Sequence, residues 1–348
     1  MVTLENSQSR QSGIELLRLV AMYMVLLLHA NYISFGKPSV EDIHLNYLTS
    51  FGRVLAEQLC IVAVNVYVLI SGWFGIKPKI KSIISLLLQV FTYSAIIMVA
   101  WIIVRRPVLH FSDVMGVLVI GRQYWFIIAY LLLYILSPVL NAFVENSSMK
   151  TIKGFLVAFF SFEFIYGWFQ GAGGFNGGYS AMSFIGLYIL ARYLRLYGTW
   201  ITNKNILFYI SSYLLLSFSV ALWVVMQYYY LGNVYFFSYI DYNCPFVIIA
   251  SVLFFLAFIK MNFKNGIVNY CSTSALSVYL IHVNPCLWRK YQSIIRELYA
   301  TSPNIGGILL IAIILVLFMV LCIFIDKIRV RLTPVNCICD RIKLLLKA

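Results

Sequence analysis

Charged residues are scarce in this chain of 348 residues: Asp, Glu, Lys and Arg make up 11% of it, and 62% is hydrophobic. A globular domain has roughly a quarter of its residues charged, so the composition indicates an integral membrane protein rather than a soluble one. Acidic residues are rarer than basic ones, which gives a formal net charge of +14. The basic residues lie mainly in short loops between apolar runs, an arrangement that reflects membrane topology, and we expect no nucleic-acid partner.

Several other features are missing. The seven cysteines form no paired framework, and the isolated Cys337-x-Cys339 is too little for a metal site. We therefore predict no metal and no permanently bound cofactor. There is no low-complexity linker and no evident internal repeat, which favours one domain. The first apolar run is long, contains Arg18 and lacks a small-residue cleavage site, so we expect it to remain as a membrane anchor.

Apolar runs of about 20 residues, the length that crosses a bilayer as a helix, recur along the chain. The predicted spans are residues 13–33, 51–76, 82–104, 118–141, 153–170, 181–198, 205–230, 240–260, 267–288 and 305–326. The sequence thus predicts an all-α integral membrane fold, a single bundle of about ten transmembrane helices. Residues 1–12 are then a cytoplasmic N-terminal segment, 13–326 the transmembrane domain and 327–348 a basic cytoplasmic tail.

Lysine and arginine predict the orientation of this bundle. The loops of one side carry the larger group: Arg10, Lys77, Lys79, Lys81, Lys150, Lys153, Arg192, Arg195, Lys204, Lys260, Lys264 and six residues of the tail. The other side carries Lys37, Arg105, Arg106, Arg122, Arg289, Lys290 and Arg296. Because cytoplasmic loops are enriched in these residues, both termini are expected in the cytoplasm and the protein in the cell membrane. The Arg105 to Arg122 segment departs from the rule.

Two ionisable residues interrupt the first apolar run, Arg18 and His29. Such groups are costly within a bilayer and usually face a polar interior where they have a function. Eleven residues of α-helix make three turns plus roughly 20°, so both side chains share one face, about 16 Å apart along the axis. The alternative is an arginine that extends to the interface and a histidine that is only packed.

Depth along the predicted spans places two further polar residues near the level of His29. Glu57 lies about six residues from the outer end of the second span, and His282 lies at a similar depth in the ninth. An ion pair with Arg53, one helical turn away, is an equally good interpretation of Glu57. For His282 a packed core histidine remains the alternative.

Several motifs occur in a fixed order: Arg-x10-His at Arg18 to His29, LISGWFGIKPK at Leu69 to Lys79, YWFIIAYLLLYILSPVL at Tyr124 to Leu140, GGYSAMSFIGLYILARYLR at Gly177 to Arg195, NCPFVIIASVLFFLAF at Asn243 to Phe258 and SALSVYLIHVNP at Ser274 to Pro285. Together they cover most of the chain. This order resembles the multi-spanning membrane acyltransferase family (acyltransferase 3 type), whose members O-acylate surface polysaccharides. The resemblance implies a transferase that moves an acyl group, most simply acetyl, from cytoplasmic acyl-CoA to a hydroxyl of a surface polysaccharide or its lipid-linked precursor.

The resemblance also implies roles for residues. His29 would accept a proton or carry the acyl group, with Arg18 as a further catalytic residue. Glu57, placed near His29 by its depth and not by the resemblance, is added to the catalytic candidates as a residue that could orient His29. Arg18 would also bind a donor phosphate, together with a basic loop that contains Lys77, Lys79 and Lys81. Family members often have arginines in this loop, and lysine does not make the same bidentate contact. Positive-inside anchoring alone is the competing explanation of these lysines.

For the acceptor, the aromatic ring of Trp125 is a candidate stacking surface, and Tyr124, Arg122 and His282 are further candidate acceptor-binding residues. Anchoring at the membrane interface would also explain Trp125. Two other classes of function stay open, a glycan flippase or polymerase and a small-molecule transporter. A transporter would often show paired halves with broken helices, and a polymerase a large outer loop, neither of which is evident.

Overall fold

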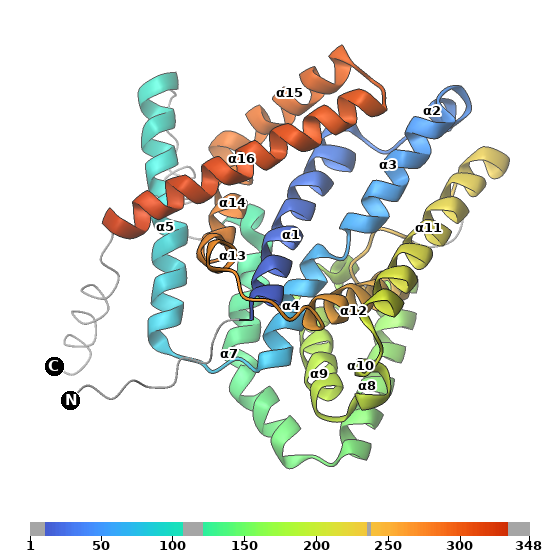
Figure 1. The fold of residues 1–348 in the computed structure, drawn as a ribbon, viewed down its shortest axis with the longest axis vertical. Helices are drawn as coiled ribbons and strands as arrows, with labels where there is room; N and C mark the ends of the chain where they lie inside the picture. The colour runs from blue at the N-terminus through green and yellow to red at the C-terminus, as the bar shows by residue number, and fades with distance from the viewer. Residues whose placement is uncertain (1–10, 107–120, 235–237, 333–348) are drawn as a thin grey trace.

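A computed structural model describes residues 11–106, 121–234 and 238–332 of the chain (Figure 1). In these ranges all regular structure is helical and there is no strand. The chain runs as α1 Ser12–Leu28, η1 His29–Phe35, α2 Val40–Leu45, α3 Tyr47–Cys60, α4 Ala63–Phe74, α5 Ile80–Arg105, η2 Arg122–Tyr124, α7 Trp125–Asn146, α8 Met149–Phe162, η3 Glu163–Phe169, η4 Asn176–Gly178, α9 Ala181–Tyr197, α10 Thr199–Thr202, α11 Ile206–Leu231, α12 Pro245–Ile259, α13 Gly266–Ser272, α14 Ala275–His282, α15 Pro285–Thr301 and α16 Ile305–Leu332.

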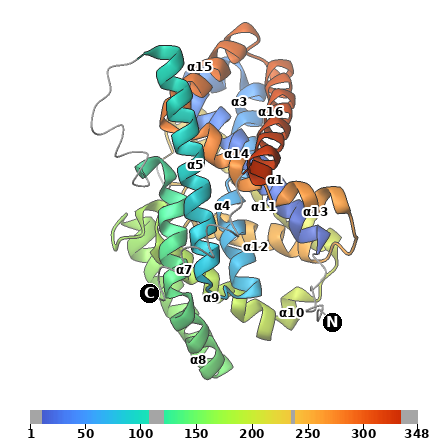
Figure 2. The same cartoon turned by 90° about the vertical axis from the view of Figure 1, so that its left-hand side faces the viewer.

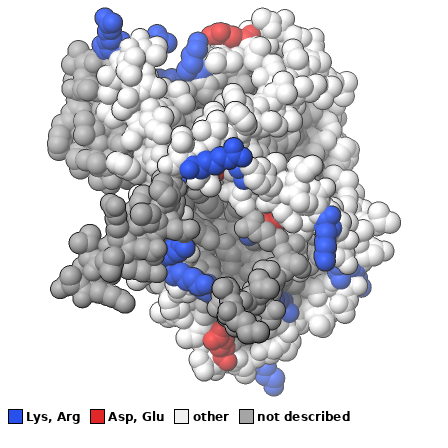
Figure 3. Space-filling model, turned by 60° about the vertical axis from the view of Figure 1, so that its left-hand side comes forward, with Lys and Arg blue, Asp and Glu red and all other residues white. Residues whose placement is uncertain are grey.

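Seven helical segments of the described chain are long and apolar enough to cross a membrane: Ser12–Phe35, Tyr47–Phe74, Ile80–Arg105, Trp125–Asn146, Met149–Phe169, Ile206–Leu231 and Ile305–Leu332. They coincide with seven of the ten predicted spans, which confirms a helical protein of the multi-pass membrane type. The surface agrees with this, because Figure 3 shows Lys and Arg side chains as separate groups on a largely uncharged face.

The other three predicted spans correspond to shorter helices, so the prediction of about ten full-length helices is not confirmed. α9 has 17 residues and α12 has 15. The predicted span 267–288 differs most. It consists of α13 and α14, with 7 and 8 residues, and its last residues already belong to α15.

The break before α15 has a local cause. Pro285 cannot donate a backbone hydrogen bond to a continuing helix, and the side chain of Asn284 caps the new one by accepting from the N–H of Cys286 at 3.0 Å. α15 is amphipathic and packs on α16 and on η1, at one end of the molecule (Figure 2). Residues 267–288 have the apolar composition of the predicted span, but the change of direction before α15 was not predicted.

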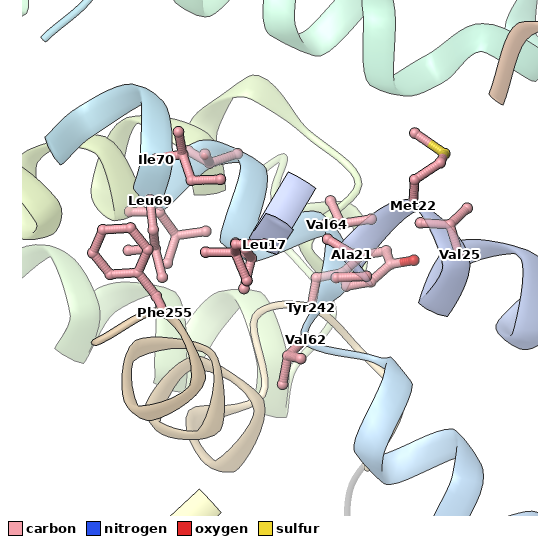
Figure 4. Packing of buried hydrophobic residues seen from close by; sticks show 14 of the residues in the cluster. Leu17, Ala21, Met22, Val25, Val62, Val64, Leu69, Ile70, Tyr242 and Phe255 are labelled. Atoms are coloured by element: carbon pink, nitrogen blue, oxygen red, sulfur yellow. The ribbon is translucent and has the colours of Figure 1, made fainter. Parts of the chain in front are cut away.

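The first helix lies inside the bundle. Leu17 and Ala21 are fully buried in the same hydrophobic cluster as residues of α4, and Leu69 of α4 lies beside Phe255 of α12 (Figure 4). α4 and α9 also approach each other very closely. A Cβ atom at Gly72 of α4 would lie 2.4 Å from the carbonyl oxygen of Tyr188, so only glycine fits there. These contacts hold α1 and α4 as the two walls of the site described next.

Candidate active site

A cavity of about 500 Å³ lies between α1, α3, α4, α7 and α14. From α1 and η1 its wall receives Arg18, Met22, Val25, Leu28, His29, Tyr32 and Ile33, and five of these follow one another at regular intervals, Arg18, Met22, Val25, His29 and Tyr32. The steps of three and four residues between them mark one face of a helix. The prediction that Arg18 and His29 share a face is therefore confirmed, and that face borders an open space.

At one end of the cavity, Arg18 is held by an acidic partner from its own helix. Its Nη1 lies 2.6 Å from Oε1 of Glu15, and the other carboxylate oxygen of Glu15 accepts from the hydroxyl of Ser272 at 2.5 Å. The Arg18 side chain is 35% exposed. This leaves guanidinium N–H groups available toward the cavity. Glu15 was not predicted as part of the site, although its spacing of three residues from Arg18 is a pairing distance on a helix.

His29 lies farther along the cavity and contacts a second histidine. Its Nδ1 is 2.7 Å from Nε2 of His282, at the end of α14. The Nδ1 of His282 is in turn 2.6 Å from the carbonyl oxygen of Val278. His282 is 1% exposed and is not part of the cavity wall, so the structure does not place it where it would bind an acceptor.

Helix α15 covers the His29 end of the cavity. The Trp288 ring meets the His29 ring edge-on, with centroids 5.2 Å apart, and Trp288 forms part of the wall. The hydroxyl of Tyr291 donates to the carbonyl of Leu26 at 3.0 Å, and Nε of Arg296 donates to the carbonyl of Ser34 at 2.9 Å. These bonds attach the helix to both sides of His29.

Glu57 also lines the cavity, but it does not bond to His29. Its Oε2 accepts from Nδ2 of Asn31 at 2.8 Å. The alternative interpretation, an ion pair between Glu57 and Arg53, is not found. The Arg53 side chain donates instead to Oδ1 of Asn31 at 3.2 Å and to the carbonyl of Gly36. Asn31 thus hydrogen-bonds to both Glu57 and Arg53. The spacing of residues within the second span could not predict this, because Asn31 belongs to the first span.

The far wall of the cavity is aromatic. Trp125 lines it, with Tyr179 at a centroid distance of 4.6 Å and Tyr242 at 5.9 Å in a nearly parallel arrangement. Tyr179 and Tyr242 also line the cavity and were not predicted. Tyr124 is not in the wall. It is 1% exposed and its hydroxyl donates to the carbonyl of Leu280 at 3.1 Å.

The remaining candidates lie outside the cavity wall. Lys77 and Lys79 are exposed on the turn between α4 and α5, and Lys81 is exposed in the first turn of α5. The turn itself is fixed, since the hydroxyl of Tyr188 accepts from the N–H of Ile76 at 2.9 Å. The side chain of Arg122 lies outside the described residues.

Among the described residues there is no group of three or more His, Cys, Asp or Glu side chains that could hold a metal ion. What the cavity offers is an arginine at one end, an imidazole with one nitrogen available at the other, and an aromatic wall. This set suits a substrate that is anionic at one end and reacts at the other.

The comparison with protein families agrees with these features. Residues 11–327 match the acyltransferase 3 family model, which is described as an acyltransferase domain. The chain belongs to this family and is thus a membrane acyltransferase in the general sense. Neither the search of curated proteins nor that of solved structures found a match.

Proposed function

We propose that this protein is a membrane O-acyltransferase that moves an acyl group, most simply acetyl, from cytoplasmic acyl-CoA to a hydroxyl of a surface polysaccharide or its lipid-linked precursor. The observation that carries the proposal is the single cavity whose wall contains both Arg18 and His29. A donor with a charged end and a reactive end about 16 Å away would fit the two.

The donor would enter at the Arg18 end. A guanidinium binds phosphate through paired N–H donors, and Glu15 fixes the direction of this one while leaving donors free. The exposed Lys77, Lys79 and Lys81 supply further positive charge. In this proposal the Arg18 end faces the cytoplasm, as the distribution of basic residues predicts, and both termini lie on that side.

The acceptor would enter at the other end and place a sugar ring against Trp125, Tyr179 and Tyr242. Sugar rings present apolar C–H faces that pack on aromatic side chains, and Glu57 in the same wall can accept a hydrogen bond from a second hydroxyl.

His29 would carry out the proton transfer. Its free ring nitrogen takes the proton of the acceptor hydroxyl as that oxygen attacks the thioester carbonyl. The C–S bond then breaks, and the proton passes from the imidazolium to the departing CoA thiolate. If His29 instead attacks the thioester carbonyl first, the C–S bond breaks, CoA leaves as the thiolate and an acyl-histidine forms. The acceptor hydroxyl then attacks the acyl carbon, the bond to the histidine nitrogen breaks, and the hydroxyl proton passes to the CoA thiolate. Both routes use the same nitrogen and the same cavity.

The proposal can be tested with an assay in which purified protein in lipid nanodiscs is supplied with radiolabelled acetyl-CoA and a glycan fraction. We expect acceptor-dependent release of CoA. His29→Gln keeps a neutral polar side chain that does not take up a proton, and we expect it to lower the transfer rate by about 10² to 10⁴.

The matched control is His44→Gln, because His44 is exposed on α2 and lies outside the cavity wall. It should leave the rate unchanged. A folded His29→Gln protein with substantial transfer activity would overturn the proposal.

A further inference from the structure

His282 is a buried titratable group that is bonded to His29 and that the proposed reaction does not use. It is not part of the cavity wall, and its ring packs against those of Tyr279, Tyr291 and Trp288. Both of its nitrogens have a partner in the structure, the carbonyl of Val278 at 2.6 Å and Nδ1 of His29 at 2.7 Å.

When both rings are neutral, these two contacts determine where the hydrogens lie. A backbone carbonyl oxygen only accepts, so Nδ1 of His282 must carry a hydrogen. A neutral imidazole carries one, so Nε2 of His282 is an acceptor and Nδ1 of His29 must donate to it. The remaining nitrogen of His29, Nε2, is then an unprotonated base. His29 lines the cavity and its Nδ1 is bonded to His282, which does not, so Nε2 is the ring nitrogen left for a substrate.

We propose that His282 is a positioning residue, which holds His29 in the one tautomer whose Nε2 can take a proton from a substrate in the cavity. This rests on the proposed function. The acceptor hydroxyl gives its proton to Nε2 of His29, which becomes an imidazolium and later returns that proton to the CoA thiolate. His282 keeps its own proton on Nδ1 throughout and touches neither substrate.

The other polar groups nearby do not compete for this role. Glu57 has Asn31 as its partner, and the hydroxyl of Ser34 donates at 2.7 Å to the carbonyl of His29 rather than to its ring. Among the described residues, His282 is the hydrogen-bond partner of the His29 side chain. Histidines that act as bases in other catalytic sites depend on such a partner for tautomer and orientation.

Two substitutions separate the positioning of His29 by His282 from any effect of His282 as a titratable group. His282→Leu removes the acceptor and lets the His29 ring exchange tautomers. His282→Gln retains the arrangement without a titratable group, because its amide N–H₂ can donate to Val278 and its carbonyl oxygen can accept from His29. For His282→Leu we expect kcat to fall by about 10² or more while KM for acetyl-CoA changes less than threefold. His282→Gln should remain within about tenfold of the wild-type kcat.

Nitrogen NMR provides the direct readout. The chain has four histidines, so ¹⁵N-histidine labelling gives few ring signals, and those lost in His29→Gln identify His29. We expect His29 to be protonated at Nδ1 in the wild type and in His282→Gln, and to show a mixture or the Nε2-protonated form in His282→Leu. His44→Gln is the control for both measurements.

The outcomes distinguish this proposal from the one on which it rests. Wild-type kcat in His282→Leu, with His29→Gln inactive, would overturn the positioning role and leave the acyltransferase proposal intact. Activity in His29→Gln would remove both. If His282→Leu does not fold, the glutamine variant decides: a folded His282→Gln protein with Nδ1-protonated His29 but a more than hundredfold loss of kcat would overturn a role limited to positioning.

Discussion

Replacing Arg18 by lysine tests whether the guanidinium binds the donor's phosphates. Lysine keeps the positive charge but replaces a planar fork of N–H donors by a single ammonium group. In the structure one nitrogen of the fork is already used, since Nη1 is bonded to Glu15 at 2.6 Å. The single ammonium group of a lysine at position 18 would therefore have to bind both Glu15 and a phosphate. We expect the donor to bind less tightly and the chemical step to be unaffected.

The size of the effect follows from exposure. A hydrogen bond to a charged group contributes about 1.5 to 3 kcal/mol. Because the Arg18 side chain is 35% exposed, water competes for the phosphate and the lower end of that range applies. A loss of about 1.4 kcal/mol is a factor of ten. Arg18→Lys should thus raise KM for acetyl-CoA about tenfold and leave kcat at saturating donor within about twofold.

The assay is initial-rate kinetics with two donors, acetyl-CoA and acetyl-pantetheine, which lacks the nucleotide and the phosphates. Arg18→Lys should lose its effect with acetyl-pantetheine. The matched control is Arg329→Lys, because Arg329 also pairs with an acidic residue three positions away, Asp326 at 2.7 Å, but does not line the cavity. An equal rise in KM for both donors, or for donor and acceptor alike, would show that Arg18 supports the bundle instead.

Two further predictions concern orientation and packing. A cysteine that replaces Lys79 should be protected from impermeant thiol reagents in intact cells and one that replaces Lys290 should react, whereas outside labelling at position 79 would reverse the proposed orientation. Gly72→Ala should lower the thermal midpoint in detergent, by an amount that corresponds to about 1 to 3 kcal/mol, because its Cβ would lie 2.4 Å from a backbone oxygen of α9. Gly52→Ala, with no atom within 4 Å of its added Cβ, is the control, and an equal loss of stability in both variants would contradict this explanation.

Much of the fold could be predicted because it depends on local composition. A segment that crosses the bilayer must be apolar over its whole length, so seven long helices could be located from hydrophobic runs alone. The shared face of Arg18 and His29 could be predicted for a similar reason, since it follows from the helical period. Both inferences concern residues close together in the chain.

The prediction was least accurate where the chain changes direction inside an apolar run. The run 267–288 contains a short helix, a turn at Thr273 and Ser274, and a second short helix before Pro285 begins α15. A hydropathy sum over a run of residues does not depend on where the backbone bends within that run. Hydropathy also does not predict which side chains of different helices contact each other. The depth estimate placed Glu57 at the level of His29, but Glu57 bonds to Asn31. Equal depth is necessary for contact and does not ensure it.

The pairing of the two histidines combines a local and a distant cause. The bond from His282 to Val278 joins residues four apart, and a histidine side chain can make such a bond at the end of a short helix. The bond from His282 to His29 joins residues 253 positions apart, and it requires α1 and α14 to pack side by side. The first bond determines which nitrogen of His282 is an acceptor, and the second transfers that constraint to His29. The sequence contains the local half of this arrangement, but the protonation of the base depends on the fold.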